Sequence, residues 1–452
     1  MQILKGQDAQ YRKMTETPVL RLITALAIPT IISMLVTSVY NMGDTYFVSK
    51  LGRQASGAVG IVFSLMAVIQ AVGFTLGMGS GSLISRLLGA QKTEEASRIA
   101  SSGFFSSLLA GILIAAGGLC LLDPLISLLG ATKTIFPYAR DYAVYILFFA
   151  PVMMASFVLN NLLRAEGRAR FAMVGIATGG ILNLFLDPVF IFVFALGIRG
   201  AALATALSQC VSFCILLSSF LRKRTSTRLS LRSVSMHARD YLSILKNGLP
   251  SFCRQGLASI STVALNRTAA IYGDAAVAAM SVVGKIFMLI FSVALGYGQG
   301  YQPVVGYNYG AKKYARVREA FFVVLTVGFG ILFVLSAAGF LAAPQLLAAF
   351  LPGDTEVIEI GSRALRYQCL ACPLLALNVT CNMTFQSIGK AWTSTLLSAL
   401  RQGIFFLPLI FLLPTMWGLP GLQLTQPVSD VFTFLCCIPF AIRFIRQIRS
   451  AM

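Results

Sequence analysis

Residues 19–47 read VLRLITALAIPTIISMLVTSVYNMGDTYF, and only Arg21 and Asp44 in this run are charged. An α-helix needs about 20 mostly apolar residues to cross a hydrocarbon core about 30 Å thick. The run therefore predicts a membrane-spanning helix. It also contains two residues that are uncommon inside such a helix, Pro29 in its first half and Asp44 near its end.

Eleven further apolar segments follow, and their lengths also suit membrane-spanning helices. They are residues 54–76, 99–122, 138–162, 171–196, 199–220, 241–271, 276–298, 317–343, 362–388, 394–414 and 421–442. These runs do not alternate between apolar and polar residues, as the strands of a membrane β-barrel would. The sequence therefore predicts an all-α membrane protein with twelve transmembrane helices and short loops.

The composition excludes a water-soluble protein. Hydrophobic residues make up 57% of the 452-residue chain and charged residues only 12%, against roughly 25% charged residues in a typical globular protein. So few charges cannot hydrate the surface of a soluble protein. The chain is also too apolar to be disordered.

The net charge of +20 comes from 36 Lys and Arg residues against 16 Asp and Glu residues. In a soluble protein this excess would suggest a nucleic-acid partner. Here most of the basic residues fall in alternate loops, on the side that carries both termini, and cytoplasmic loops carry such an excess. We expect a multi-pass protein of the plasma or inner membrane with both termini cytoplasmic, surrounded by lipid and without a nucleic-acid partner.

The chain repeats itself at a constant offset of 221 residues. The equivalent pairs include Pro29 and Pro250, Gly79 and Gly300, and Gly89 and Gly310. The repeat predicts two lobes of six spans, an N-lobe (residues 1–221) and a C-lobe (241–452), joined by a basic cytoplasmic linker (222–240). Because each lobe has an even number of spans, the repeat is parallel, with a pseudo-two-fold axis along the membrane normal. Transporters built in this way move substrate between the halves by rocking.

Ionisable side chains inside a membrane are costly and usually functional. Asp44 lies late in the first span, and Asp187 lies in the fifth span with Asn183 one turn before it. Thr205 and Ala201 lie on one face of the sixth span. Carboxylates in an apolar cavity can exchange a proton near neutral pH, and with amide and hydroxyl oxygens they can bind a small hard cation such as Na⁺. The alternatives are capped helix ends for the two aspartates and interhelical hydrogen bonds for Asn183 and Thr205.

Further polar side chains share faces of the first, fourth and sixth spans, and we expect them to line a substrate cavity. They are Thr37, Tyr40, Ser156, Asn160 and Gln209. No ATP-binding motif is found, because the Gly-rich run at 77–82 lacks the Gly-Lys-Ser/Thr ending of a phosphate loop. We therefore expect no cofactor beyond a coupling ion, H⁺ or Na⁺, and no enzymatic activity.

The C-lobe has a different set of charges inside its spans. Asp44 corresponds to Leu265, and Asp187 corresponds to Pro408 or Leu409. The charges of the C-lobe spans are instead Arg254, Arg267, Lys285, Arg401 and Asp430. These residues predict ion coupling in the N-lobe alone and a structural ion pair between Arg401 and Asp430, and they leave the role of the other bases open.

Together these features resemble the MATE (multidrug and toxic compound extrusion) transporters over nearly the whole chain. The residues that carry the resemblance are Ala27-Ile28-Pro29, Asp44 to Val48, Gly77 to Gly81, Leu186-Asp187-Pro188, Gly200 to Thr205, and Pro303, Asn308, Gly310 and Ala311. The resemblance implies two six-helix lobes around a V-shaped cleft. It also implies export of cationic amphiphilic compounds in exchange for H⁺ or Na⁺.

The resemblance is to the prokaryotic branch with an acidic site in the N-lobe. It implies that Asp44, Asn183, Asp187 and Thr205, with Ala201 nearby, form the coupling site, and that Pro29 kinks the first span. We expect a monomer. Two other functions stay open: a lipid-linked saccharide flippase of the same superfamily, which the C-lobe arginines favour and twelve spans disfavour, and a regulated channel.

Overall fold

The computed structural model describes residues 2–350 and 353–452, with side chains from residue 8 onward. All regular elements of these residues are helical. Those of the first half are α1 (Gln2–Glu16), α2 (Val19–Ser49), α3 (Arg53–Gly89), α4 (Thr93–Cys120), α5 (Leu122–Leu128), α6 (Phe136–Ala165), α7 (Ala169–Pro188), η1 (Val189–Val193) and α8 (Ile198–Leu221). A short helix in the linker follows, η2 (Leu231–Ser233).

The helices of the second half repeat this order. They are α9 (Ala238–Ala270), α10 (Asp274–Gly310), α11 (Tyr314–Leu341), α12 (Ala343–Phe350), α13 (Thr355–Ala371), η3 (Cys372–Leu374), α14 (Leu375–Ser387), α15 (Ala391–Ala399), η4 (Leu400–Phe405), α16 (Phe406–Trp417) and α17 (Leu419–Ser450). Two predicted spans of this half are thus irregular, as is the span 171–196 of the first half, which passes through the π-helical turn η1. Residues 362–388 are interrupted at η3, where Pro373 has no N–H for a helical hydrogen bond, and residues 394–414 pass through the π-helical turn η4.

Within the described residues, eleven helical stretches are long and apolar enough to cross a membrane. The seventh predicted span, 241–271, is helical as α9 but is not among them, because Arg254, Gln255 and Arg267 reduce its hydropathy. α9 is nevertheless 33 residues long and packs beside α3 and α15. The predicted all-α membrane fold with two six-helix lobes is confirmed.

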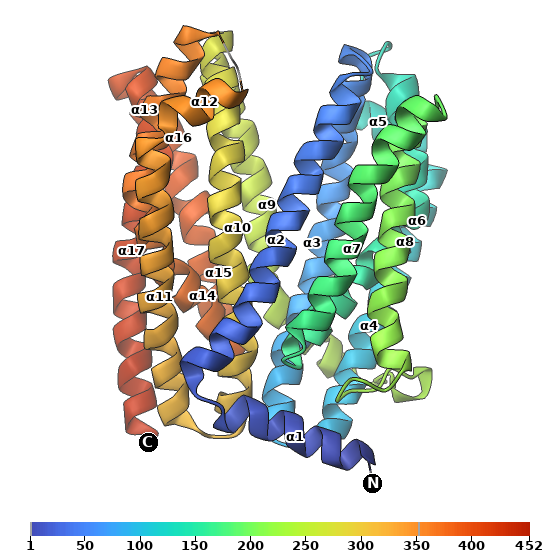
Figure 1. The fold of residues 1–452 in the computed structure, drawn as a ribbon, viewed down its shortest axis with the longest axis vertical. Helices are drawn as coiled ribbons and strands as arrows, with labels where there is room; N and C mark the ends of the chain where they lie inside the picture. Colours follow the sequence, from blue (N-terminus) through green and yellow to red (C-terminus); the bar gives the residue numbers. More distant parts are fainter. Residues whose placement is uncertain (1, 351–352) are drawn as a thin grey trace.

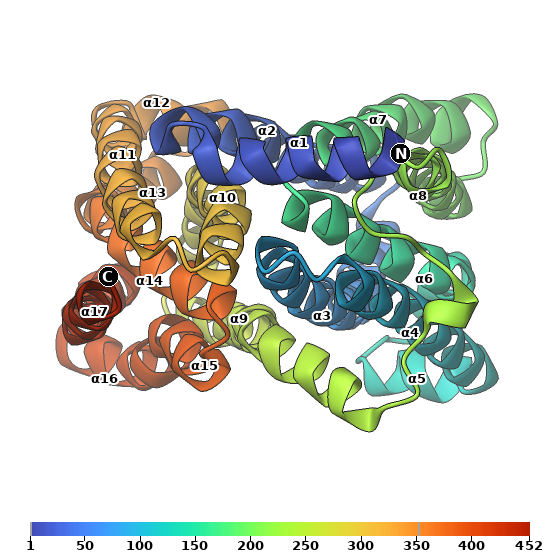
Figure 2. The same cartoon turned by 90° about the horizontal axis from the view of Figure 1, so that it is seen from below.

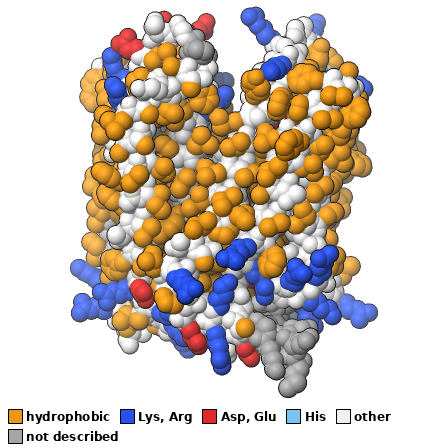
Figure 3. All heavy atoms as spheres, viewed as in Figure 1, with side chains coloured by type: hydrophobic (Ala, Val, Ile, Leu, Met, Phe, Trp, Pro, Cys, Tyr) orange, Lys and Arg blue, Asp and Glu red, His pale blue; other side chains and the backbone are white. Residues whose placement is uncertain are grey.

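The two lobes lean apart toward one end of the molecule (Figure 1). The space-filling view shows a hollow between them at that end, an apolar belt around the middle, and Lys and Arg residues gathered at the opposite end (Figure 3). Both chain termini lie at the basic end, where the lobes meet (Figure 1). We call this the closed end, and the hollow the cleft.

The internal repeat is visible in the backbone. Left-handed φ values recur at matching positions of the two halves: Gly52 (107°) and Gly273 (96°), Gln91 (60°) and Lys312 (57°), and Gly197 (57°) and Gly418 (61°). Gln91 and Lys312 are unusual, since side chains other than Gly rarely adopt positive φ. The two halves therefore turn their loops in the same way despite their different side chains.

The first long helix of each half, α2 or α9, crosses from one lobe to the other. α2 begins against α10, where Ala27 approaches Gly300 closely, and it ends against α7, where Gly43 contacts Leu184. Ser38 on α2 also shares a hydrogen bond of 2.7 Å with Ser292 on α10. Pro29 lies inside the crossing part of this helix.

α9 crosses in the equivalent way. It begins against α3, where the backbone of Ile244 lies over Gly79, and it ends against η4, where Ser261 Oγ donates to the Gln402 carbonyl at 2.8 Å. Pro250 lies inside its crossing part. The pair α2 and α9 thus links the lobes symmetrically.

At the closed end the lobes also meet through α3 and α10. Gly89 lies so close to α10 that a Cβ atom there would stand 2.1 Å from the Tyr307 carbonyl oxygen, and at Gly310 it would stand 2.1 Å from the Arg86 carbonyl oxygen. These two contacts are equivalent under the repeat. Only glycine permits the two backbones to approach so closely.

Polar side chains join the lobes beside these glycines. Arg164 Nη1 on α6 donates to Gln299 Oε1 on α10. Ser82 Oγ on α3 donates to the carbonyl of Gln386 at 3.1 Å, and Arg86 Nη2 donates to Asn247 Oδ1 at 3.1 Å. The closed end is therefore a packed and hydrogen-bonded interface.

α1 and the linker cover the closed end. Seen from below, α1 lies across both lobes (Figure 2). Its Gln10 side chain donates to the Glu166 carbonyl at 2.7 Å, and its Met14 carbonyl accepts from Asn308 at 3.1 Å. Glu166, in the α6–α7 loop, also accepts from the linker, from the backbone N–H of Ser226 at 2.6 Å and of Thr227 at 3.0 Å. Burial raises the pKa of Glu166 above its ordinary value, an effect that these hydrogen bonds oppose.

The linker is bound to the N-lobe along most of its length. Ser97, Ser101 and Ser102 of α4 form hydrogen bonds of 2.9 to 3.1 Å with the backbone of residues 228–235. Arg98 of α4 forms an ion pair of 3.2 Å with Asp240, in the first turn of α9. The polar segment that the sequence presents as a connection is thus an ordered part of the surface.

Candidate functional site

A buried polar cluster lies where α7 meets α8 in the N-lobe. Asp187 is fully buried and Asn183 is nearly so, one helical turn before it. Asn183 Nδ2 donates to Asp187 Oδ1 at 3.2 Å and to Thr205 Oγ1 at 3.4 Å. Ala201, one turn before Thr205 on α8, is also fully buried. Of the predicted coupling residues, the structure places Asn183, Asp187 and Thr205 in direct contact.

Asp44 of α2 lies near this cluster. Two tyrosines, Tyr40 and Tyr142, lie close to it. Tyr40 lies one turn before Asp44 and close to Gln209 of α8. Tyr142 of α6 is fully buried and lies near both Asp44 and Asp187. We did not predict Tyr142, although it lies 14 residues before Ser156 on the same face of the fourth span, a spacing that could have indicated it.

Three oxygens of the cluster have no hydrogen-bond partner in the part of the chain that the structure describes. They are Asp44 Oδ1, Asn183 Oδ1 and Asp187 Oδ2, and all three are buried. A buried acceptor without a partner costs about 1–3 kcal/mol. Carboxylate and amide oxygens are suitable ligands for a proton or a hard monovalent cation, so the donor set fits the coupling ion that the sequence predicts.

The space beside the cluster is small. A cavity of about 30 Å³ is lined by Thr37, Tyr40, Asn183, Thr205 and Gln209, among others. That volume holds one or two waters or an ion and no drug-sized molecule. Thr37, Tyr40 and Gln209, which we predicted as substrate contacts, therefore lie beside the buried acidic cluster in this structure.

The other two predicted cavity residues lie on α6. Asn160 Nδ2 donates to the Ala172 carbonyl of α7 at 3.2 Å, which ties the two helices together. Ser156 is buried, and its hydroxyl has no hydrogen-bond partner among the described residues. Pro29 lies within α2, and the helix continues through it.

The C-lobe holds the predicted ion pair. Arg401 Nε lies 2.7 Å from Asp430 Oδ1, and both side chains are buried. Gln368 and Gln426 each donate to the Asp430 carboxylate at 2.9 Å. Arg267 and Lys285 are exposed. Within the described residues no three His, Cys, Asp or Glu side chains cluster as metal ligands.

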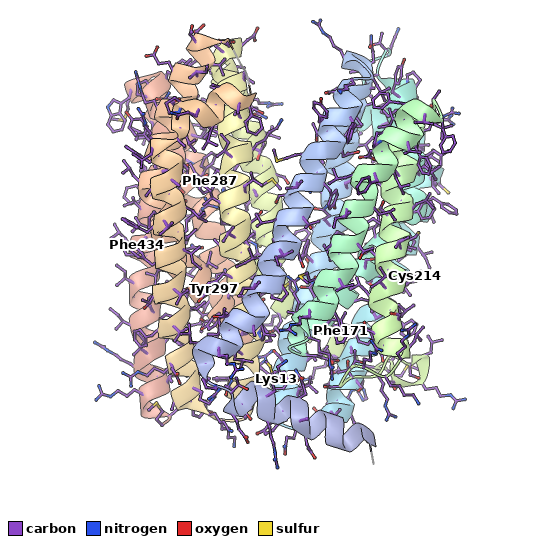
Figure 4. The ribbon with its side chains drawn as sticks, viewed as in Figure 1. Lys13, Phe171, Cys214, Phe287, Tyr297 and Phe434 are labelled. Carbon is purple, nitrogen blue, oxygen red and sulfur yellow. The ribbon has the colours of Figure 1, made fainter. Side chains whose placement is uncertain are left out.

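A larger cavity lies beside this ion pair. Its volume is about 220 Å³, and its lining includes Arg254, Phe287, Phe291, Asn378 and Arg401. Phe287 belongs to α10 and is labelled in Figure 4. The two lobes therefore differ in chemistry: the N-lobe contains a small acidic site and the C-lobe a larger cavity with basic and aromatic walls.

These features are those of a two-lobed membrane transporter with a buried acidic cluster in its N-lobe. The sequence profile of the MatE family matches residues 29–189 and 250–412, once in each lobe. The chain therefore belongs to the MatE family of transporters, as the resemblance implied.

Similar proteins support this assignment over more than nine-tenths of the chain. The chain is 26% identical to the multidrug export protein MepA of Staphylococcus haemolyticus, over 92% of this chain and 91% of that one. It is 28% identical to a multidrug resistance MATE family transporter solved in an outward-facing conformation, with a TM-score of 0.92 over 97% of this chain and 98% of that one. It is also 28% identical, with a TM-score of 0.91 over 97% and 98% of the two chains, to a MOP superfamily transporter from Pyrococcus furiosus, for which a binding pocket of reverse polarity suggests a different function.

Proposed function

We propose that this protein is a secondary multidrug exporter, which moves cationic amphiphilic compounds across the membrane in exchange for H⁺ or Na⁺. The observation that carries the coupling mechanism is the set of buried oxygens without partners on Asp44, Asn183 and Asp187. The names of the similar proteins support the export of drugs. They also disfavour the saccharide flippase.

The coupling site works by changing its charge. Binding of H⁺ or Na⁺ removes one negative charge from the pair of carboxylates, so the cluster tolerates burial between α2, α7 and α8 better than it does without the ion. After the ion leaves, the unpaired negative charge favours a state in which water reaches the cluster, because a buried charge without a partner is costly. Binding and release of the ion therefore favour different arrangements of the lobes, as coupling requires.

Movement of the lobes supplies the access. We propose that the N-lobe (1–221) and the C-lobe (241–452) rock between the arrangement of this structure and one in which they part at the closed end, with the linker 222–240 on the cytoplasmic side and both termini inside. The basic residues of the closed end support this orientation (Figure 3). The cleft then opens to the outside in this structure, and the protein acts as a monomer in the plasma or inner membrane.

Transport by reconstituted protein tests the proposal. Vesicles loaded with a cationic dye should export it under an imposed pH gradient or an imposed Na⁺ gradient, and the gradient that drives export identifies the ion. Asp187→Asn should abolish driven export, because an amide neither binds a proton near neutral pH nor supplies a negative ligand.

Asp123→Asn is the matched control, because Asp123 is exposed and pairs with Arg140 on the surface at 3.0 Å. It should export at the wild-type rate. Full gradient-driven export by Asp187→Asn, at wild-type protein levels, would contradict the coupling role of the cluster.

A further inference from the structure

The C-lobe cavity has a wall with cationic side chains that have no role in the proposed ion coupling. The cavity lies among α9, α10, α14, α15, η4 and α17, and two of its α10 residues, Gly284 and Met288, are exposed. Arg254 from α9 and Arg401 from η4 both line it. The two guanidinium groups differ in what they contact.

Arg401 is fully engaged by the protein. Its charge is neutralised by Asp430, and its guanidinium lies over the rings of Phe291 and Phe287, at 4.7 Å and 5.5 Å from their centroids. The two rings are stacked, with centroids 6.1 Å apart and planes 17° from parallel. Arg401 therefore fixes an aromatic wall and has no charge left to offer a ligand.

Arg254 has no such partner. Its Nη1 is buried without a hydrogen bond, and no ion pair or hydrogen bond of this side chain is found within the described residues. Arg254 as a whole is only partly buried, so its charge costs less than a fully desolvated one would, but its guanidinium has no counter-charge among the described residues. A guanidinium in this setting pairs with a carboxylate through two parallel hydrogen bonds, which form the strongest common anion contact.

The aromatic wall indicates the rest of the ligand. The cavity volume is about 220 Å³, and apolar cavities of about 150 Å³ hold a benzene ring, so one or two fused rings with a substituent fit. Amide side chains at the rim, Gln255 and Asn378, can bond to polar substituents. These features describe an aromatic compound with an anionic group.

We propose that this cavity binds aromatic carboxylates, with the carboxylate on Arg254 and the ring against Phe287 and Phe291. The export of such compounds rests on the proposed function, whereas their binding does not. The substrates would then include acids and zwitterions in addition to cations.

Binding to the purified full-length protein tests this assignment. The probe is 1-naphthoate, and 1-naphthylmethylammonium is the matched cation with the same ring, each titrated by calorimetry at pH 7. Wild-type protein should bind naphthoate. Arg254→Gln should bind it about tenfold or more weakly, because a hydrogen bond to a charged group is lost.

Two further variants control for charge and folding. Arg254→Lys keeps the charge and should retain most of the affinity, and Arg267→Gln removes an exposed arginine from the same helix and should bind as wild type. If wild-type protein does not bind naphthoate, or if Arg254→Gln binds it as tightly as wild type, the proposal is wrong. Equal losses of affinity for the anion and for the cation in Arg254→Gln would also overturn it, since they indicate a distorted cavity.

Dye export in vesicles separates this result from the proposed function. A wild-type protein that binds naphthoate through Arg254 but fails to export a cationic dye would refute multidrug export and leave the binding site standing. A protein that exports the dye and does not bind naphthoate would refute only the site.

Discussion

The glycine pair at the closed end gives the sharpest test of alternating access. Gly89 and Gly310 let α3 and α10 touch backbone to backbone, and these helices belong to different lobes. Replacement of Gly89 by Ala places a Cβ atom 2.1 Å from the Tyr307 carbonyl oxygen, whereas ordinary contact begins at 3.4 Å. The two helices must therefore separate by about 1.3 Å at this point.

The free energy of this clash sets the expected effect. The oxygen belongs to a helix backbone and cannot rotate away as a side chain would, so the cost falls in the usual range for overpacking, about 1–3 kcal/mol. The clash disappears when the lobes part at the closed end. The equilibrium should then shift away from the arrangement of this structure, with its closed end packed, by about 5- to 150-fold.

Hydrogen–deuterium exchange of the purified protein measures this shift. In Gly89→Ala, amides at the closed ends of both α3 and α10 should exchange faster, and amides that line the cleft should exchange more slowly. Gly310→Ala should give the same pattern because the contact is equivalent. Gly60→Ala is the matched control on α3, since a Cβ atom there meets nothing within 4 Å. Faster exchange confined to residues around position 89, with α10 and the cleft unchanged, would refute the reasoning.

Two further predictions concern contacts that stabilise the C-lobe and the linker. Arg401→Met leaves the Asp430 carboxylate buried without its cation and should lower the free energy of unfolding by about 3–5 kcal/mol. The double variant Arg401→Met with Asp430→Leu should lower the free energy of unfolding by less. Thermal unfolding compares the two variants, and a double variant less stable than the single one contradicts this account. Glu166→Ala removes the carboxylate that accepts from the backbone N–H groups of Ser226 and Thr227. Trypsin should therefore cleave residues 222–232 faster in this variant than in wild type or in Glu166→Gln, whose amide oxygen still accepts a hydrogen bond. Equal cleavage rates would show that this carboxylate does not hold the linker.

The sequence could predict the features that repeat and the polar residues that are rare inside an apolar span. The correspondence of Pro29 with Pro250 and of Gly89 with Gly310 indicated two lobes, because equal sequence at a constant offset implies equal structure. Asp44 and Asp187 stood out because a charge inside an apolar span is rare. Asn183 and Asp187 lie one turn apart on one helix, so their contact followed from helical geometry alone.

The features that it could not predict depend on distances between helices. The spacing of Tyr142 from Ser156 places it on the polar face of the fourth span, but its position near the two aspartates depends on the packing of α6 beside α7 and α8. The sequence predicted the pair of Arg401 with Asp430, but it left the role of Arg254 open, because its lack of a partner depends on how α9 packs against the other helices. The linker reads as a polar connection, and its binding to α4 depends on three serines of another segment.

The crossing of α2 and α9 has a mechanical consequence. Each of these helices has its first turns seated on one lobe and its last turns on the other, and the linker is bound down to Asp240. The linker therefore has no free length that could accommodate a rotation between the lobes. The rotation has to bend the two helices themselves. Each contains a proline in its crossing part, Pro29 or Pro250, and a helix bends easily at a proline because one backbone hydrogen bond is missing there. The pivots of the molecule would thus lie inside the membrane, in two transmembrane helices related by the repeat.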